Sequence, residues 1–304
     1  LAKRIFISGF AGSVVLTPQP KSNQVVVKFA KQIDTADLPS GVTEGPSADE
    51  FLGQITLKTV NVGDTIEVRA QLPPDKTAWA KWAQGKKVPL ARIEVVAPDS
   101  MMAEIYLTHG DVKVTKWKAP VTITHQEGHI TVDDVVGELN IRTMMGHTKV
   151  DNIKGPVTIE NFSAQLALGQ ITGKLKARTF SGELKLAGLK GPASLSTQKG
   201  AVFTNDTDGA LEIQTGLGPV SVTDHKGSLT GKSDAGSIDA RISGEVEVQL
   251  SSDSGGLSIN VTKESQADVS LSTRGTINAP KILSHKRSSS GRMVRGALQG
   301  SEPG

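Results

Sequence analysis

The stretch GELKLAGLKGPASLSTQKG, residues 182–200, decides the fold of this chain. Its glycines Gly182, Gly191 and Gly200 are nine residues apart, and aliphatic or small residues stand two and four places after each of them. Alternation over a few residues is the pattern of a short strand with one buried face, and glycine permits a tight corner after it. The stretch therefore predicts a nine-residue unit of one strand and one corner.

The same period extends over much of the chain. From Gly110 to Gly236 there are fifteen positions at nine-residue steps, and thirteen of them are glycine, with Ala119 and Ala164 as the exceptions. One more unit follows Gly244, where the register slips by one residue. Val, Ile or Leu fill 26 of the 32 places two and four residues after these positions, and none of the places one and three residues after them. A fixed period of this length is typical of a solenoid.

Alternate units differ, which indicates that one full coil has eighteen residues. Polar residues suited to hydrogen bonding with the corner backbone recur every eighteen places, at Thr143, Asn161, Thr179, Thr197, Thr215 and Ser233. The predicted fold class is all-β: a single-stranded parallel β-helix with 18-residue coils built from nine-residue, glycine-cornered units. A calcium-binding β-roll would need G-G-x-G-x-D, and hexapeptide helices have a period of six, so neither fits.

A third interior column is predicted seven places after each corner. It comprises Val135, Ile153, Ile171 and Leu189 on one side of the coil, and Met144, Phe162 and Phe180 on the other. The column then turns polar, at Gln198, Thr207, His225 and Ser243. These residues predict a wide core in the first half of the solenoid and a narrower, more polar one in the second, where His225 is expected to be a hydrogen-bonded structural residue.

Three parts are expected along the chain. Residues 1–97 alternate as strands without the nine-residue period and are expected to form an N-terminal cap, with an acidic loop at 34–50 and a helical insert at 73–87. Residues 98–279 form the predicted β-solenoid. Residues 280–304 are basic and rich in Ser and Gly, and are expected to be a mobile tail or a loose cap.

Composition narrows the function classes. Only 4% of the 304 residues are aromatic and 32 are glycine, which favours many short strands over a helical bundle. The formal net charge of +3 is too small to favour nucleic acid or an anionic membrane as a partner. The absence of cysteine excludes disulfides, thiolate metal sites and cysteine nucleophiles. No apolar run is long enough for a membrane span. The first residue is Leu1 and not Met, so an upstream segment is expected to have been removed.

Stacked polar residues are the first candidates for chemistry. His129 and His147 are eighteen residues apart in one outward column with Asp111, and Asp133 and Asp151 form a second pair. Such groups could bind a divalent metal or act as acid and base on a polysaccharide. The preferred interpretation is a solvated polar face, so no catalytic residue, metal or cofactor is predicted.

Aromatic residues are the other candidates. Trp79 and Trp82 lie on one face of the helical insert, where they could contact a sugar or a protein partner or, as the preferred interpretation has it, cover the end of the core. Phe203 is the only aromatic residue at the scored outward places of the coils. No long aromatic sugar-binding groove is therefore predicted on the coils, and binding is expected at end loops.

The arrangement resembles the bacterial Toastrack-type family of adhesin-like β-solenoid domains. The resemblance rests on LARIEVVAPDSMMAEIYLTHGDVKVTKWKAPVTITHQEGHITV at 90–132 and on units such as ARTFSGELKLAGLKGPASLSTQKG at 177–200. It implies a non-enzymatic interaction or structural module outside the cytoplasm, in the periplasm or at the bacterial cell surface, with an envelope glycan or envelope protein as partner. The alternatives are a polysaccharide hydrolase or lyase on a β-helix scaffold and an envelope-stress sensor domain.

Overall fold

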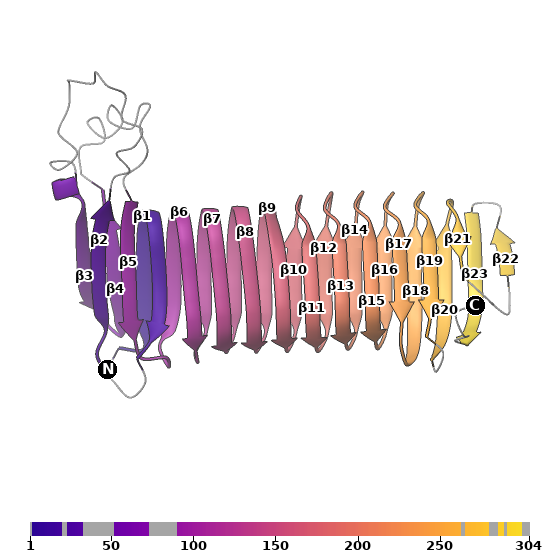
Figure 1. The fold of residues 1–304 in the computed structure, drawn as a ribbon, viewed down its shortest axis with the longest axis horizontal. Helices are drawn as coiled ribbons and strands as arrows, with labels where there is room; N and C mark the ends of the chain where they lie inside the picture. The colour runs from indigo at the N-terminus through magenta and orange to yellow at the C-terminus, as the bar shows by residue number, and fades with distance from the viewer. Residues whose placement is uncertain are drawn as a thin grey trace, which may run out of the picture. The chain divides into compact units, whose positions relative to one another are not determined.

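The computed structural model describes residues 2–19, 23–32, 52–72, 90–262, 265–279, 285–288 and 291–299, and apart from one helical turn at 52–54 their regular structure is β (Figure 1). The chain divides into two compact units, Leu1–Thr143 and Met144–Gly304. Strand β8 (Leu139–Lys154) runs across this division. The predicted acidic loop at 34–50 and helical insert at 73–87 lie outside the described residues.

The first unit begins the parallel stacking. Its strands are β1 (Arg4–Pro18), β2 (Val26–Gln32), β3 (Thr56–Val62), β4 (Thr65–Gln71), β5 (Leu90–Ala97), β6 (Met102–Trp117) and β7 (Val121–Val136). Strand β1 pairs in parallel with β4, β5 and β6, and β6 pairs in parallel with β7. Strand β2 is antiparallel to β5, and β3 is antiparallel to β4. Ala103 aligns with Val121, so this coil repeats every eighteen residues, as predicted.

The second unit consists of two parallel ladders that share β9 (Val157–Thr172). One ladder continues through β10 (Leu175–Thr179), β12 (Ala193–Thr197), β14 (Leu211–Thr215), β16 (Leu229–Ser233), β18 (Glu245–Ser252) and β20 (Gln266–Thr273). The other continues through β11 (Leu184–Lys190), β13 (Val202–Asp208), β15 (Val220–Lys226), β17 (Ile238–Ile242), β19 (Leu257–Val261) and β21 (Ile277–Asn278). Each coil therefore contributes one short strand to each ladder.

The coils of the second unit lengthen toward the C-terminus. Leu184 aligns with Val202, eighteen residues on, whereas Leu229 aligns with Val248, nineteen residues on. Val248 then aligns with Val269, twenty-one residues on. The slip predicted at Gly244 is confirmed. Beyond it, β22 (His285–Ser288) and β23 (Gly291–Gln299) are antiparallel to each other, and β23 is antiparallel to β20.

The predicted interior is confirmed. Every one of the 32 places two and four residues after the repeating corners is buried, including the six that are not Val, Ile or Leu: Thr148, Ala177, Ala193, Thr204, Gly231 and Ala240. Leu184, Ile213 and Val222, which test the alternation directly, are at most 1% exposed. The aliphatic residues of each strand therefore face the inside of the coil, and burial of this apolar surface drives the stacking.

The predicted polar column is also buried, and most of it bonds to the corner backbone. The Asn161 side-chain amide donates to the Ala164 carbonyl oxygen at 2.8 Å, and the Thr215 hydroxyl donates to the Gly218 carbonyl oxygen at 3.1 Å. Thr197 Oγ1 accepts a hydrogen bond from the Gly200 backbone amide at 3.0 Å. The hydroxyl of Thr179 has no hydrogen-bond partner. The column fixes the corners by satisfying backbone groups that the turn leaves unpaired.

The prediction for the third interior column is right on one side of the coil and wrong on the other. Val135, Ile153, Ile171 and Leu189 are at most 2% exposed, but Met144, Phe162 and Phe180 are 53, 54 and 42% exposed. The residues before the first set adopt positive φ, for example 54° at Asn152. Such a left-handed residue breaks the alternation, so the next side chain turns inward.

On the other side of the coil no left-handed residue intervenes among the described residues, and alternation simply continues. The polar residue six places after the corner therefore points inward, and the next residue points to solvent. The same rule accounts for the later positions, because Thr207 and His225 are buried whereas Gln198 is exposed. In the second half, the buried polar residues predicted for this column thus occur along one side only.

Gly200 shows why the corners require glycine. A Cβ atom at this position would overlap the carbonyl oxygen of Gly182 in the preceding coil and would lie 2.6 Å from its carbonyl carbon. Gly209 has the same close approach and, in addition, a φ of +131° that residues with side chains rarely adopt. At these two corners the coils stack backbone against backbone, which leaves no room for a side chain.

Candidate functional site

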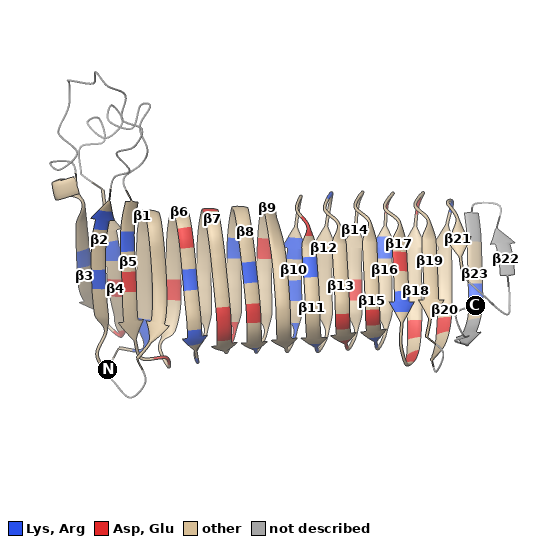
Figure 2. Ribbon diagram, in the orientation of Figure 1, with Lys and Arg blue, Asp and Glu red and all other residues tan. Residues whose placement is uncertain are grey.

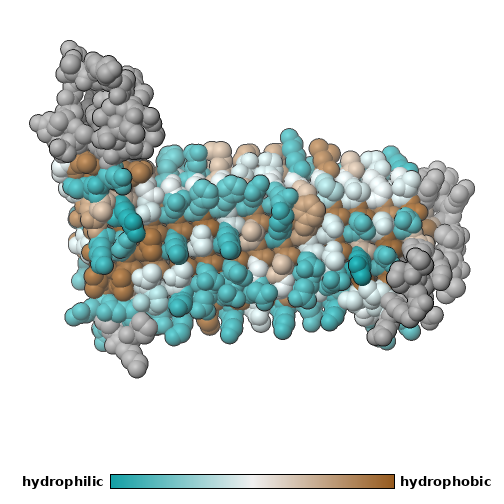
Figure 3. Space-filling view, in the orientation of Figure 1, coloured by the Kyte–Doolittle hydropathy of each residue, from teal (hydrophilic) through white to brown (hydrophobic). Residues whose placement is uncertain are grey.

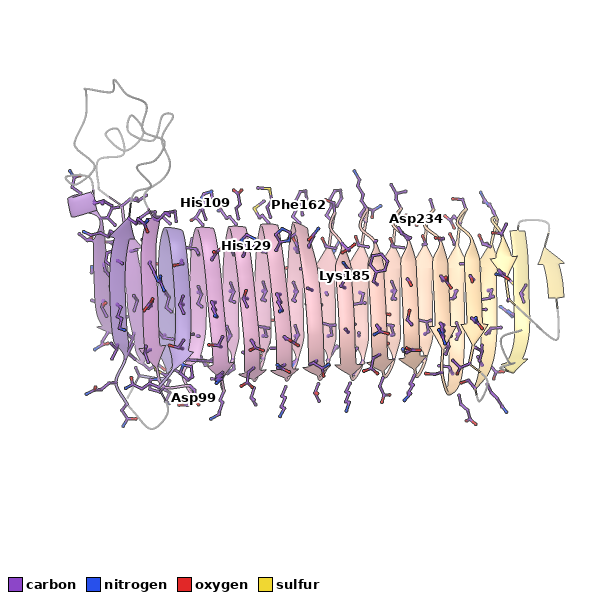
Figure 4. The ribbon with its side chains drawn as sticks, in the orientation of Figure 1. Asp99, His109, His129, Phe162, Lys185 and Asp234 are labelled. Carbon is purple, nitrogen blue, oxygen red and sulfur yellow. The ribbon has the colours of Figure 1, made fainter. Side chains whose placement is uncertain are left out.

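One outward histidine and one outward aspartate form an exposed pair. In the first unit, Asp111 Oδ1 lies 3.2 Å from His129 Nδ1 and also accepts the His129 backbone amide at 3.2 Å. Both side chains are about two-thirds exposed. Figure 4 shows His129 at the edge of the strands. His147 belongs to the second unit and is exposed on β8. Among the described residues, no group of three or more His, Asp or Glu side chains is placed to hold a metal ion.

Two other histidines are buried and serve the fold. His225 is fully buried, as predicted, with Nδ1 2.9 Å from Thr207 Oγ1 and Nε2 3.2 Å from the Ser228 carbonyl oxygen. His125, which the sequence did not single out, replaces a threonine in the polar column, and its Nε2 lies 2.9 Å from the Gly110 carbonyl oxygen. Burial lowers the pKa of both imidazoles. Both are therefore structural residues and not surface ligands.

Trp79 and Trp82, the partner contacts considered from the sequence, lie outside the described residues. Within the described ranges, no helix has the length and apolarity that crossing a membrane requires.

One edge of the second unit carries an exposed apolar row, here called the edge ladder: Met144, Met145, Phe162, Phe180 and Leu217. The rings of Phe162 and Phe180 are stacked, with centroids 5.1 Å apart and 4° between their planes, and Lys199 Nζ lies 5.5 Å from the Phe180 centroid. Phe162 lies along the same edge as Asp234 (Figure 4). Because the two phenyl faces cover each other, the ladder presents mainly ring edges to solvent.

A groove lies on the outer face of the ladder of strands that contains β11, β13 and β15, and it extends over β8 and β9 as well. This face groove has a volume of about 530 Å³. Its outward lining residues are Lys149, Asp151, Ala167, Gly169, Lys185, Ala187, Phe203, Asn205, Ser221 and Thr223. Figure 4 shows Lys185 on this face of the strands.

Small residues create the face groove. Three neighbouring outward places on β9 and β11 hold Ala167, Gly169 and Ala187, so the sheet surface there is uncovered, while Lys149, Lys185 and Phe203 rise around it. A Cβ on Gly169 would lie 2.7 Å from Asp151 Oδ1, so the glycine also makes room for that carboxylate. The floor is thus apolar, and the polar side chains stand along its rim.

The charges around the face groove nearly cancel. Lys185 Nζ forms an ion pair with Glu183 Oε1 at 2.5 Å, and Lys149 projects from β8 two residues before Asp151. Toward β13 and β15 the rim is uncharged, with Asn205, Ser221 and Thr223. Across the strands, basic and acidic residues are interspersed (Figure 2), and apolar and polar surface alternate (Figure 3). The groove therefore offers an apolar floor, one phenyl ring, and amide and hydroxyl groups.

Sequence reasoning noticed Phe203 but not the groove beside it. The available signal was the run of small residues at outward places in two successive coils, Ala167, Gly169 and Ala187. Periodicity identifies the inward columns because the same residue types repeat there. A recess on the outer face depends instead on small residues at outward places, and those residues follow no such repeat.

Among the comparisons with known proteins, the family model supports the fold. No curated protein matches the chain. A crystal structure described as a "putative cell adhesion protein" from Clostridium sporogenes is similar to it at 11% sequence identity and a TM-score of 0.29, covering 74% of this chain and 94% of that one. The model of the Toastrack DUF4097 family matches residues 135–291, which is more than half of the chain and includes the face groove and the edge ladder. The stacked coils and this match together show that the chain belongs to the Toastrack DUF4097 family.

Proposed function

We propose that this protein is a non-enzymatic, adhesin-like interaction module of the bacterial cell envelope, acting outside the cytoplasm in the periplasm or at the cell surface. Membership of the Toastrack family supports the proposal. The observation that carries it is the face groove. The groove lies on coils that parallel strand pairing and buried aliphatic columns hold in a fixed arrangement. A rigid surface loses little conformational entropy on binding.

In this proposal the binding surface lies on the coils. From the sequence alone, binding was expected at the end loops. Trp79 and Trp82 remain a second proposed contact, on the evidence of sequence alone. Residues 1–97 and 280–304 are proposed to cap the stack, and the antiparallel strands β2, β3 and β23 support this division because they end the parallel pairing.

The test is co-sedimentation of the full chain with isolated bacterial envelopes, compared with a chain that lacks residues 73–87. Binding of the full chain supports an envelope-interaction role, and loss of binding on deletion assigns the contact to Trp79 and Trp82. Cell fractionation with an antibody against the protein tests the location. No co-sedimentation, or a cytoplasmic fraction that contains all of the protein, would contradict the proposal.

A polysaccharide hydrolase is the second candidate, because the face groove lies beside Asp151. Glycoside hydrolysis generally needs two carboxyl groups on either side of the scissile bond. Asp151 is the single carboxylate among the described residues that line the groove. Release of reducing sugars from envelope polysaccharide, abolished by Asp151→Asn, would favour the enzyme over the binding module.

A further inference from the structure

We infer that the face groove binds an uncharged oligosaccharide that lies along the stacking direction of the coils, with Phe203 as the platform for one sugar ring. This inference rests on the proposed function and specifies its ligand. It is carried by the shape of the recess, the chemistry of its floor and rim, and the balance of its charges, all within the second unit.

The floor and rim match the two kinds of surface that a sugar presents. A pyranose ring has an apolar C–H face and a periphery of hydroxyl groups. The exposed floor of Ala167, Gly169 and Ala187 and the 39% exposed ring of Phe203 can accept the C–H face. The Asn205 amide and the Ser221 hydroxyl can exchange hydrogen bonds with the periphery.

Charge argues for an uncharged ligand. The ammonium of Lys185 is already paired with Glu183 at 2.5 Å, and the positive charge of Lys149 is opposed by Asp151 on the same strand. An acidic polysaccharide would need an excess of basic groups, and a basic one would need an excess of acidic groups. The lining holds two lysines and one carboxylate, and Glu183, which lies outside the lining, pairs with Lys185, so the charges balance locally. A neutral polyol requires no counter-charge.

A peptide added as an extra strand is excluded by the pairing at this site. Strand β11 is hydrogen-bonded to β9 and β13, and β13 to β11 and β15. The backbone groups under the groove are therefore already paired on both sides, and the main-chain bonds that give strand addition its affinity cannot form. The edge ladder differs from the groove as well, because one face of Phe162 and one face of Phe180 cover each other, and Lys199 Nζ lies 5.5 Å from the Phe180 ring centroid.

The length of the groove suits several sugar units and not one. It extends over the five strands β8, β9, β11, β13 and β15. At the usual strand spacing of ~4.8 Å, four intervals span roughly 19 Å. A ligand that follows the groove would contact Lys149 and Asp151 near one end and Ser221 and Thr223 near the other, with Phe203 between them.

The experiment is a glycan array with the full chain, followed by calorimetry on the neutral hexasaccharides cellohexaose and chitohexaose and on the anionic hexagalacturonate. The variants are Phe203→Ala, which removes the platform, and Ala187→Leu, which fills the floor at an exposed place. The matched control is Leu217→Ala, which truncates an exposed apolar side chain on the edge ladder of the same unit.

Neutral oligosaccharides should bind in preference to hexagalacturonate. Phe203→Ala should weaken that binding roughly tenfold. Ala187→Leu should weaken it at least as much, and Leu217→Ala should leave it unchanged. Circular dichroism and thermal melts establish that each variant is folded. Absence of binding to every neutral glycan on the array, preference for acidic glycans, or unchanged affinity in both groove variants would overturn the inference.

The envelope assay separates failure of this inference from failure of the proposed function. Binding to envelopes without affinity for neutral glycans would overturn the glycan assignment and leave the interaction module standing. Sensitivity of that envelope binding to protease would then identify a protein partner. No binding to envelopes of any kind would overturn both.

Discussion

Gly200→Ala is the most direct test of how the coils stack. The φ of Gly200 is not in the left-handed region, so alanine carries no backbone penalty of that kind at this position. The added methyl group, however, would occupy the space of the Gly182 carbonyl, whose carbon is 2.6 Å from the Cβ position. The obstacle is backbone, which cannot rotate away as a side chain can. The two coils must therefore separate locally to accept alanine.

Separation would strain the hydrogen bonds that hold this corner. The amides of Gln198 and Lys199 donate to the Phe180 carbonyl oxygen of the preceding coil at 3.2 and 3.0 Å, whereas the bond from the Gly200 amide to Thr197 Oγ1 lies within one coil. At about 0.5–1.5 kcal/mol for each of the two bonds between the coils, their loss lowers the free energy of unfolding by about 1–3 kcal/mol. That is a large fraction of the roughly 5–15 kcal/mol by which natural domains are stable.

The assay is urea unfolding followed by far-UV circular dichroism, with Gly256→Ala as the control. A Cβ on Gly256 would lie 3.0 Å from the hydroxyl of the exposed Thr276, which can rotate away, and at an ordinary contact distance of 3.8 Å from the Thr276 carbonyl oxygen. For an m-value of about 2–3 kcal/mol/M, the unfolding midpoint of Gly200→Ala should fall by about 1 M. Gly256→Ala should stay close to the parent. Equal midpoints for the two variants would refute the backbone-stacking account of the repeating glycines.

Three further predictions follow from the interior of the second unit. Thr204→Val should raise the free energy of unfolding by about 1 kcal/mol because the buried Thr204 hydroxyl has no hydrogen-bond partner. Thr207→Val on the same strand should lower it by about 1–3 kcal/mol because His225 Nδ1 loses its partner. Leu184→Asp should lower it by more than about 4 kcal/mol by burying a carboxylate, and Lys185→Asp should change it by less than about 0.5 kcal/mol. Lowering the pH from 7.5 to 5 should destabilise the parent, and His225→Gln should reduce that pH dependence.

The sign of the pH effect comes from burial. Because burial lowers the pKa of His225 in the folded protein, the unfolded chain takes up the proton first as the pH falls below the usual value of about 6.5. The stability that this residue contributes is complete above that value and is lost as the pH falls toward the lowered folded pKa. His125 acts in the same direction in the first unit. Urea midpoints measured across this range test it, and greater stability at pH 5 than at pH 7.5 would show that the imidazoles are not buried in neutral form.

Two of these predictions compare a pair of variants, and the difference within each pair is the test. Opposite signs for Thr204→Val and Thr207→Val would confirm that hydrogen bonding, and not side-chain shape, distinguishes the two hydroxyls. Equal melting temperatures for Leu184→Asp and Lys185→Asp would contradict the inside and outside assignment of β11.

The period of the sequence was enough to predict the fold because every inward place obeys the same physical demand. Residues such as Leu184 and Val202 align in the same ladder and enclose the same apolar interior, so the same residue types recur. The left-handed column was harder to predict. Asp134, Asn152, Asp206 and Asp224 are residue types that tolerate positive φ, but Gln170 occupies the same column and hides the signal.

Without that column, the alternation on the two sides of the coil could not be distinguished, and Phe162 and Phe180 were assigned to the interior. The face groove could not be predicted from the period of the sequence, for a different reason. Its floor exists because outward side chains at Ala167, Gly169 and Ala187 are too small to cover the sheet, and no repeating demand acts on outward places. Trp79 and Trp82 lie in a part of the chain where sequence is the only guide.

The lengthening of the last coils has a consequence for how such a chain can change. Pairing at eighteen, nineteen, twenty and twenty-one residues shows that the corners absorb extra residues while the strands keep their inward and outward faces. Gly244, with nothing within 4 Å of its Cβ position, is a corner of this kind. Insertions that enter through such corners add surface without disturbing the interior, and duplication of one whole coil adds length. Insertions and duplications in the gene can therefore give this protein new exposed surface or a longer stack of coils. For the same reason, a foreign peptide can be inserted at such a corner for display.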